Sequence, residues 1–494
     1  MKKIITLLSI ISVCSMTLGQ QSSGLINMEE ATFKTASGDT VEGHRGSITV
    51  PENRSNPNSP DIAVHFVRLK STNPNPSAPL VYLAGGPGGS CTWQAENPRS
   101  LERWKAFLEI GDVILLDQRG TGAGEERVLF VRREDPPGDA FASVEKAEAF
   151  RKKIAEAALT EFKARGIDLG GYTTLESARD MDVLRKALGY DKLSLMGFSY
   201  GTHLGQTYIK YFGSHVENAV LIGVEGLNHT YKLPSTMDAQ FRKIAMMANS
   251  DPNVNTEVPD LLALYDRVIA KLDKEPVELA VTSPITRQSM TMTVGSYALK
   301  VLLRFDIGDA SDIPVFPRLL YMIDQGDYSA LQWFLQKRIR AFYGIQGMSA
   351  TMDPASGATA NRMQRIKLEE EKSLFKDAVN LNMGGDSWPV PDLGDEFREP
   401  FASDVRTLFM SGTLDFNTPP YQAEEVRWGF SNSSHIIVVN AGHEQILTHP
   451  DAPKTIIRFL KGEDVNDVGL SQPKLRFIPI KGKSDDIWHP SLDN

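Results

Sequence analysis

Residues 197–201, Gly-Phe-Ser-Tyr-Gly, place Ser199 in a setting that suits nucleophilic chemistry. Residues 193–196 are typical of a buried strand, and residues 202–212 are typical of a helix. A tight strand-to-helix turn strains the serine backbone and presents its hydroxyl at the carboxyl end of a sheet. The sequence therefore predicts a nucleophile at Ser199; the alternative is a structural serine in a glycine-lined turn.

A serine hydroxyl needs a histidine base that is oriented by a carboxylate. Along chains that carry such a turn, the nucleophile comes first, the acid second and the histidine last. His443 follows an apolar run at residues 436–439, which predicts a loop at the carboxyl end of a strand. The remaining histidines of this region open a strand, begin a helix or lie in the tail: His435, His449 and His489. We expect His443 to be the base.

The orienting acid is predicted by the same reasoning. Asp415 follows a buried strand at residues 407–411, and residues 417–420 then break the structure before the next helix. Asp404 precedes that strand and would lie at its opposite end. We therefore expect Asp415 to hold His443 in the tautomer that accepts the serine proton.

Acyl transfer also needs donors for the developing oxyanion. An apolar strand pattern at residues 81–84 leads into Gly-Gly-Pro-Gly-Gly-Ser at residues 85–90. The expected donors are the amides of Tyr200 and Gly86. A phosphate-binding loop is the alternative for this glycine-rich turn, but the sequence contains neither the GxxxxGK[ST] nor the GxGxxG pattern of such loops. No CxxC or HExxH motif occurs either, so we expect no metal site and no cofactor.

The elements that must position these residues have the pattern of a mostly parallel sheet flanked by helices. Residues 47–50 and 61–70 predict an antiparallel start. Short apolar runs suit parallel strands that are buried on both faces, at residues 79–84, 112–117, 193–197, 219–223, 407–411 and 435–439. Helical patterns at residues 175–188 and 202–212 alternate with them, which predicts an α/β fold.

This alternation stops after Gly226 and resumes near Val405. The interval has helical patterns, a hairpin pattern at residues 277–294, and a loop-like composition at residues 349–360 and 382–398. We expect a catalytic domain in two parts, residues 20–226 and 401–462. A mainly helical cap, residues 227–400, is inserted between them, and residues 463–494 form a tail.

Residues 1–19 have the layout of a signal peptide, with Lys2 and Lys3 before an apolar run and small residues before Gln20. We expect a secreted or periplasmic protein; the alternatives are a membrane anchor, for which the run is short, or lipid attachment at Cys14. Cys91 would then be the sole cysteine, either an apolar filler or a reactive thiol. A formal charge of −9 without a basic stripe disfavours nucleic-acid binding.

Four motifs together resemble the prolyl aminopeptidase and tripeptidyl aminopeptidase group of α/β-hydrolases. They are residues 85–89, residues 117–122 (Asp-Gln-Arg-Gly-Thr-Gly), the Ser199 turn, and residues 411–415 with Gly442 and His443. The resemblance spans residues 40–226 and 400–462. It implies an α/β-hydrolase fold and cleavage of short peptides from a free N-terminus. It also implies a Ser199–Asp415–His443 triad, and a buried structural pair at Asp117 and Arg119.

The chain departs from this family after the strand that follows the Ser199 turn. Family members commonly carry Asp-Gly there, whereas this chain has Glu225 and Gly226. An aminopeptidase must bind an ammonium group, and a buried carboxylate is the usual means. Glu225 is the candidate for this role; the alternative is an exposed loop acid. An esterase on the same framework and a catalytically silent binding protein are the competing functions.

Overall fold

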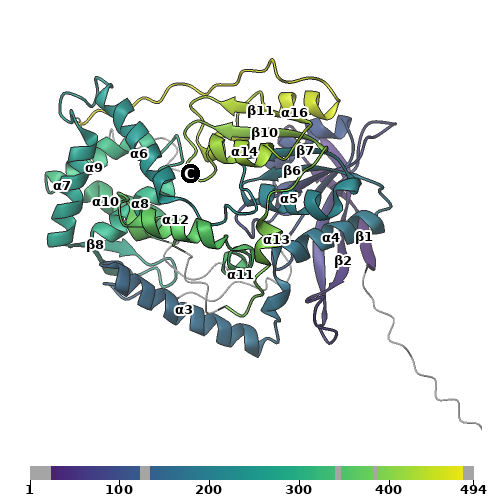
Figure 1. The fold of residues 1–494 in the computed structure, drawn as a ribbon, viewed down its shortest axis with the longest axis horizontal. Coiled ribbons are helices and arrows are strands. Elements are labelled where there is room, and N and C mark those ends of the chain that lie inside the picture. The colour runs from purple at the N-terminus through teal and green to yellow at the C-terminus, as the bar shows by residue number, and fades with distance from the viewer. Residues whose placement is uncertain (1–23, 123–133, 340–346, 382–387, 482–494) are drawn as a thin grey trace, which may run out of the picture.

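The computed structural model describes residues 24–122, 134–339, 347–381 and 388–481. The segment expected to be a signal peptide, residues 1–19 with Cys14, lies outside these ranges. A nine-stranded sheet in the order β1-β2-β3-β5-β4-β6-β7-β10-β11 forms the centre of the catalytic domain (Figure 1). Six neighbouring strands, β5, β4, β6, β7, β10 and β11, run parallel. At one edge of the sheet, β1, β2 and β3 pair antiparallel, and β3 is antiparallel to β5. The mostly parallel sheet of an α/β fold is thus confirmed.

The strands of the sheet are β1 Ile26–Lys34, β2 Thr40–Pro51, β3 Asp61–Leu69, β4 Leu80–Leu83, β5 Val113–Leu116, β6 Leu193–Phe198, β7 Val216–Ile222, β10 Arg406–Gly412 and β11 Ser433–Val438. All residues of β4, β5 and β6 are buried, because helices cover both faces of the sheet. Alternate residues of one strand enter opposite clusters, such as Val81 and Leu83 on one face and Leu80 and Tyr82 on the other.

Helices α4 (Thr174–Ala187) and α5 (Tyr200–Phe212) pack on the face that includes Val81. Helices α2 (Pro98–Lys105) and α16 (Ala452–Leu460) pack on the other face. Side-chain oxygens of Asn97 and Thr173 cap the starts of α2 and α4. The shorter helices of this domain are α1 Trp93–Glu96, α14 Pro420–Arg427 and α15 His443–Leu447.

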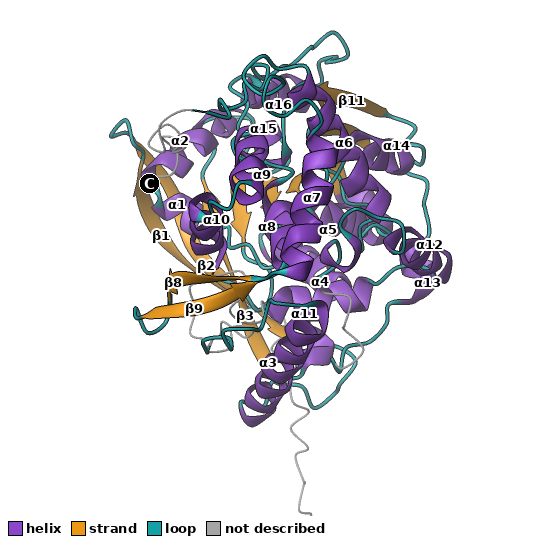
Figure 2. Cartoon of the chain, turned by 90° about the vertical axis from the view of Figure 1, so that its left-hand side faces the viewer, coloured by secondary structure: helices purple, strands orange, loops and turns teal. Residues whose placement is uncertain are grey.

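A mainly helical cap lies between β7 and β10 in the chain and beside the sheet in space (Figure 1). From its side, α6–α9 stand in front of the sheet with the β8–β9 hairpin below them (Figure 2). Its elements are α6 Pro234–Asn249, α7 Leu261–Lys274, β8 Val277–Thr282, β9 Ser289–Val294, α8 Ser296–Asp306, α9 Phe316–Asp324, α10 Ser329–Arg338, α11 Gly347–Ser356, α12 Ala360–Glu370 and α13 Gly394–Arg398.

The hydrophobic core of the cap includes residues from outside the insertion. Helix α3 (Val144–Ala164) supplies Ala147, Phe150 and Ile154 to it, and its later residues pack against the sheet. The segment after α16 crosses to the cap, where Leu475 and Phe477 are buried (Figure 1). Cap and catalytic domain are therefore joined through packed side chains as well as by the chain itself.

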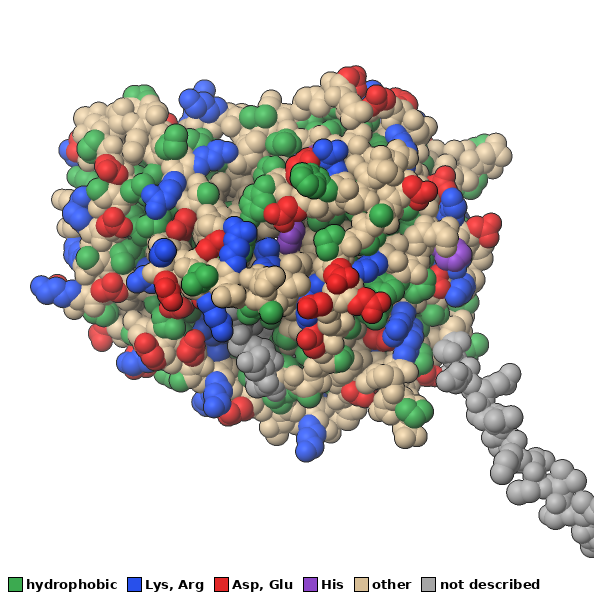
Figure 3. Space-filling model, viewed as in Figure 1, with side chains coloured by type: hydrophobic (Ala, Val, Ile, Leu, Met, Phe, Trp, Pro, Cys, Tyr) green, Lys and Arg blue, Asp and Glu red, His purple; other side chains and the backbone are tan. Residues whose placement is uncertain are grey.

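Acidic and basic side chains are interspersed on the face drawn in Figure 3. Within the described ranges no helix is long and apolar enough to cross a membrane.

Candidate active site

Ser199 lies in the turn between β6 and α5, with backbone angles of φ 55° and ψ −125°. A non-glycine residue at positive φ is strained, and the neighbouring glycines permit the tight turn around it. A Cβ atom on Gly201 would lie 1.9 Å from the Leu83 carbonyl oxygen, and one on Gly197 would lie 2.5 Å from the Gly201 oxygen. Both glycines are thus required because the start of α5 presses against β4 and β6.

Asp415 and His443 come together at the carboxyl ends of β10 and β11. The Nδ1 atom of His443 donates to Asp415 Oδ2 over 2.7 Å, which leaves Nε2 to accept a proton. Asp415 is 2% exposed. Thr418 also holds the carboxylate: its amide donates to Oδ1 over 3.0 Å, and its hydroxyl donates to Oδ2 over 2.5 Å. The carboxylate is therefore fixed from two sides.

The electrostatics of this pair favour an ionised acid. Burial raises the pKa of Asp415, but His443 and the hydrogen bonds from His443 and Thr418 outweigh it, and the net pKa is lowered. Burial lowers the pKa of His443, whereas the charge and hydrogen bond of Asp415 raise it above the ordinary value. The phenyl ring of Phe198 packs on the imidazole with ring centroids 4.9 Å apart.

The glycine-rich loop lies directly against Ser199. A Cβ atom on Gly85 would be 2.9 Å from the Cβ of Ser199. Gly86 is exposed and has φ 124°, which favours glycine. Tyr200 is the first residue of α5, so its amide has no acceptor within the helix. The loop and the helix start thus meet at the serine, and oxyanion binding by the amides of Gly86 and Tyr200 stays a prediction.

Asp117 and Arg119 are both buried, but they do not form the pair that the family resemblance suggested. Asp117 Oδ1 accepts the amides of Cys91 and Thr92, over 2.5 Å and 3.1 Å, and thereby anchors the end of the glycine-rich loop. The guanidinium of Arg119 donates to both carboxylate oxygens of Asp180, from Nε to Oδ2 over 2.7 Å and from Nη2 to Oδ1 over 2.8 Å. Asp117 therefore holds the glycine-rich loop, whereas Arg119 ties the loop after β5 to helix α4.

Glu225 lies buried three residues after the end of β7, and its carboxylate is already engaged. The Nζ atom of Lys232, itself nearly buried, binds Glu225 Oε2. The backbone of Glu225 is fixed as well, because its amide donates to the hydroxyl of Thr202 over 2.8 Å. Gly223, two residues earlier, lies close to the base: a Cβ atom on it would be 3.1 Å from Cε1 of His443.

Sequence reasoning did not identify Thr418, Lys232 or Phe198. Thr418 stands three residues after Asp415, a spacing at which an amide often donates to an aspartate side chain, so its signal was present. Phe198 is the variable second residue of the five-residue motif. Lys232 lies in a loop before α6 and carries no signal of its own.

Residues 78–301 match a family model described as alpha/beta hydrolase fold, and residues 373–470 match one described as TAP-like protein. Together with the sheet order and the turn at Ser199, these matches show that the chain has an α/β-hydrolase fold.

Among curated proteins, a tripeptidyl aminopeptidase of Streptomyces lividans is 33% identical over 190 residues, which cover 36% of this chain and 35% of that protein. The serine protease Hip1 of Mycobacterium bovis is 28% identical over 192 residues, 36% of this chain and 35% of its own length. The match thus spans about a third of these relatives. A solved structure, Rv0554 of Mycobacterium tuberculosis, is 15% identical and covers 85% of this chain and 100% of its own, with a TM-score of 0.39.

The raised pKa of His443 predicts the pH dependence of reactivity at Ser199. Only the neutral imidazole can accept the serine proton, so the rate should fall as the pH drops through the pKa of His443. The midpoint of this fall is expected above 6.5, because Asp415 favours the imidazolium. A fluorophosphonate probe without titratable groups, used from pH 5 to 9, measures this directly. A midpoint at or below 6.5 would contradict the assignment.

Proposed function

We propose that the chain is an exported serine hydrolase that cleaves short peptides from a free N-terminus. The observation that carries the proposal is the Asp415–His443 hydrogen bond at the sheet edge where strained Ser199 meets the glycine-rich loop. The tripeptidyl aminopeptidase relative supports a peptide substrate over an ester. Export rests on the signal-peptide pattern of residues 1–19.

In the proposed reaction, Ser199 Oγ attacks the peptide carbonyl carbon and its proton passes to His443 Nε2. Asp415 stabilises the resulting imidazolium, and the amides of Tyr200 and Gly86 bind the oxyanion. His443 then protonates the leaving amine. Water hydrolyses the acyl-enzyme by the same route in reverse, which restores the Ser199 hydroxyl and the neutral imidazole.

Glu225 remains our candidate for binding the substrate ammonium group, with Lys232 as the group that competes for its carboxylate. Two cations at one buried carboxylate repel each other, so a substrate amine would have to displace the Lys232 ammonium or share the second oxygen.

A matched pair of peptide anilides, one with a free N-terminus and one N-acetylated, tests the exopeptidase proposal. Acetylation should lower kcat/KM about 10²-fold, because it removes the positive charge that forms a charge-assisted hydrogen bond with the Glu225 carboxylate. Glu225→Gln should weaken cleavage of the free peptide and leave the acetylated one unchanged. Equal kcat/KM for the two anilides would reject the exopeptidase proposal. Faster turnover of the matching acyl ester without amine dependence would instead favour the esterase.

A further inference from the structure

The loops that carry Asp415 and His443 are held by the cap as well as by the sheet. A turn of the cap at residues 307–310, which follows α8, contacts both loops. We call this segment the cap turn. Its hydrogen bonds reach the base loop directly and the acid loop through Gln240 of α6. They therefore connect the cap to both catalytic loops.

The contact with the base loop begins at the histidine itself. The amide of His443 donates to the carbonyl oxygen of Gly308 over 2.8 Å. Gln445, two residues further on in α15, donates from Nε2 to Asp309 Oδ1 over 2.9 Å and accepts the Ala310 amide over 3.3 Å. A Cβ atom on Gly442 would lie 2.4 Å from the Gly308 oxygen. The glycine before the histidine is therefore required by the cap.

The contact with the acid loop is made through Gln240 of α6, which is 6% exposed. Its Nε2 atom donates to the carbonyl oxygen of Leu414 over 2.6 Å and to that of Ile307 over 3.2 Å. One side-chain amide thus bridges the residue before Asp415 and the first residue of the cap turn.

The side chains on either side of Asp415 belong to the core of the cap. Leu414 and Phe416 are each 1% exposed, and both pack in the cap cluster instead of the two sheet clusters. The acid loop is therefore anchored in the cap by packing, and Gln240 sets its register.

Ion pairs with helix α10 hold the residues on both sides of the cap turn. Asp306, at the end of α8, is fully buried and accepts a hydrogen bond from Arg338 Nε over 2.8 Å. Lys337 binds Asp312 over 2.5 Å. Both cations come from the last turn of α10, so a shift of the cap turn would disturb ion pairs made by two buried carboxylates.

We propose that the cap turn, with Gln240 and Gln445, positions Asp415 and His443 for catalysis, so that the cap completes the triad instead of merely covering it. The proposal rests on the proposed Ser-His-Asp function. Gln240 and Gln445 are positioning residues, because they act on the loops and do not touch the reacting atoms. Their loss should therefore lower kcat with little change in KM.

The variants Gln240→Leu and Gln445→Ala test this proposal in the full-length chain. Misplaced acid and base loops should slow fluorophosphonate labelling and lower kcat by about 10- to 100-fold. The pKa of His443 should fall as Asp415 moves away, so the acid limb of the labelling profile should shift to lower pH. Loss of folded protein alone would reduce the amplitude of labelling and leave that midpoint in place.

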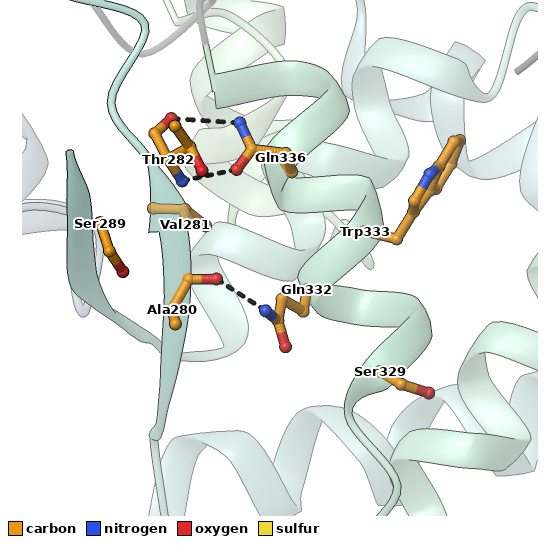
Figure 4. Close-up of a pocket in the computed structure, with 8 residues that line it drawn as sticks. All are labelled: Ala280, Val281, Thr282, Ser289, Ser329, Gln332, Trp333 and Gln336. Carbon is orange, nitrogen blue, oxygen red and sulfur yellow. Dashed lines mark hydrogen bonds between the residues drawn. The ribbon is translucent and has the colours of Figure 1, made fainter. Parts of the chain in front are cut away.

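The matched control is Gln332→Ala. Gln332 lies on α10, the same helix that supplies Lys337 and Arg338, and its Nε2 donates to the Ala280 carbonyl oxygen of β8 over 2.8 Å (Figure 4). This variant also loses one glutamine-to-backbone hydrogen bond of the cap, and it should label at the wild-type rate.

The proposed function and the positioning role are rejected by different results. If the wild-type protein is not labelled, or Ser199→Ala is labelled equally, the proposed function is wrong and the positioning role falls with it. If the wild type is labelled and both Gln240→Leu and Gln445→Ala match Gln332→Ala in rate and in pH midpoint, the positioning role is wrong and the proposed function stands.

Discussion

Replacing Ser199 by alanine should lower kcat by about 10⁶-fold, because the acyl-enzyme can no longer form. Alanine retains the Cβ atom of serine, so the strained turn between β6 and α5 should still form and the Tm should stay close to that of the wild type. Loss of labelling by a fluorophosphonate probe, read on a gel beside the rate of anilide cleavage, measures the effect.

The structure supplies a demanding control for this variant. Ser411 Oγ lies 3.0 Å from His435 Nε2, and His435 Nδ1 lies 2.5 Å from Glu424 Oε1, so a second serine, histidine and acid are linked in order. Ser411 is fully buried within β10 and has no strained turn. Ser411→Ala should therefore keep full labelling.

Unchanged labelling in Ser199→Ala would reject the serine nucleophile. An unlabelled wild type would favour the catalytically silent binding protein over any hydrolase.

The buried parallel strands could be predicted closely from the sequence, because a short continuous apolar run bounded by turn residues is typical of a strand covered on both faces. The run at residues 112–117 became β5, Val113–Leu116, and the run at residues 407–411 became β10, Arg406–Gly412. Strand β1 carries no such pattern, because Asn27, Glu29 and Glu30 are polar and exposed at the sheet edge, and only Ala31 and Phe33 are buried.

Two helices show where local sequence was misleading or incomplete. Residues 349–360 have a loop-like composition, yet α11 extends to Ser356 because Met348 and Met352, four residues apart, pack on the sheet cluster. Helix α3 has a clear helical spacing in Phe150, Ile154 and Phe162. Its packing against both the cap and the sheet depends on tertiary contacts that no local pattern contains.

The candidate site could be predicted to the extent that it depends on the ends of strands. Asp415 and His443 each follow a strand, and neighbouring parallel strands bring their carboxyl ends to one edge. The partner of Glu225 could not be predicted in this way, because Lys232 reaches it through the conformation of a loop. The contacts of Gln240 and Gln445 likewise join residues 67 to 174 positions apart along the chain, and only the folded cap brings them together.

Replacing Asp415 by asparagine should lower kcat by about 10⁴-fold, and the contacts of Thr418 explain why. The Thr418 amide donates to Oδ1, so it should hold the asparagine oxygen at that position and turn the new NH₂ group toward His443 Nδ1. The imidazole would then carry its proton on Nε2, facing Ser199, and could not accept another. Loss of the negative charge should also lower the pKa of His443 and shift the acid limb of the rate to lower pH.

Asp404→Asn is the matched control for this variant, since Asp404 is exposed and precedes the same strand, β10, at its opposite end. It should retain the wild-type kcat and pH profile. Steady-state kinetics from pH 5 to 9 on both variants separate the two outcomes. If Asp415→Asn kept its kcat within about tenfold of the wild type, the tautomer argument would be wrong. His443 would then have to be oriented by the Thr418 hydroxyl, 3.1 Å from Nδ1, with Asp415 reduced to holding that hydroxyl in place.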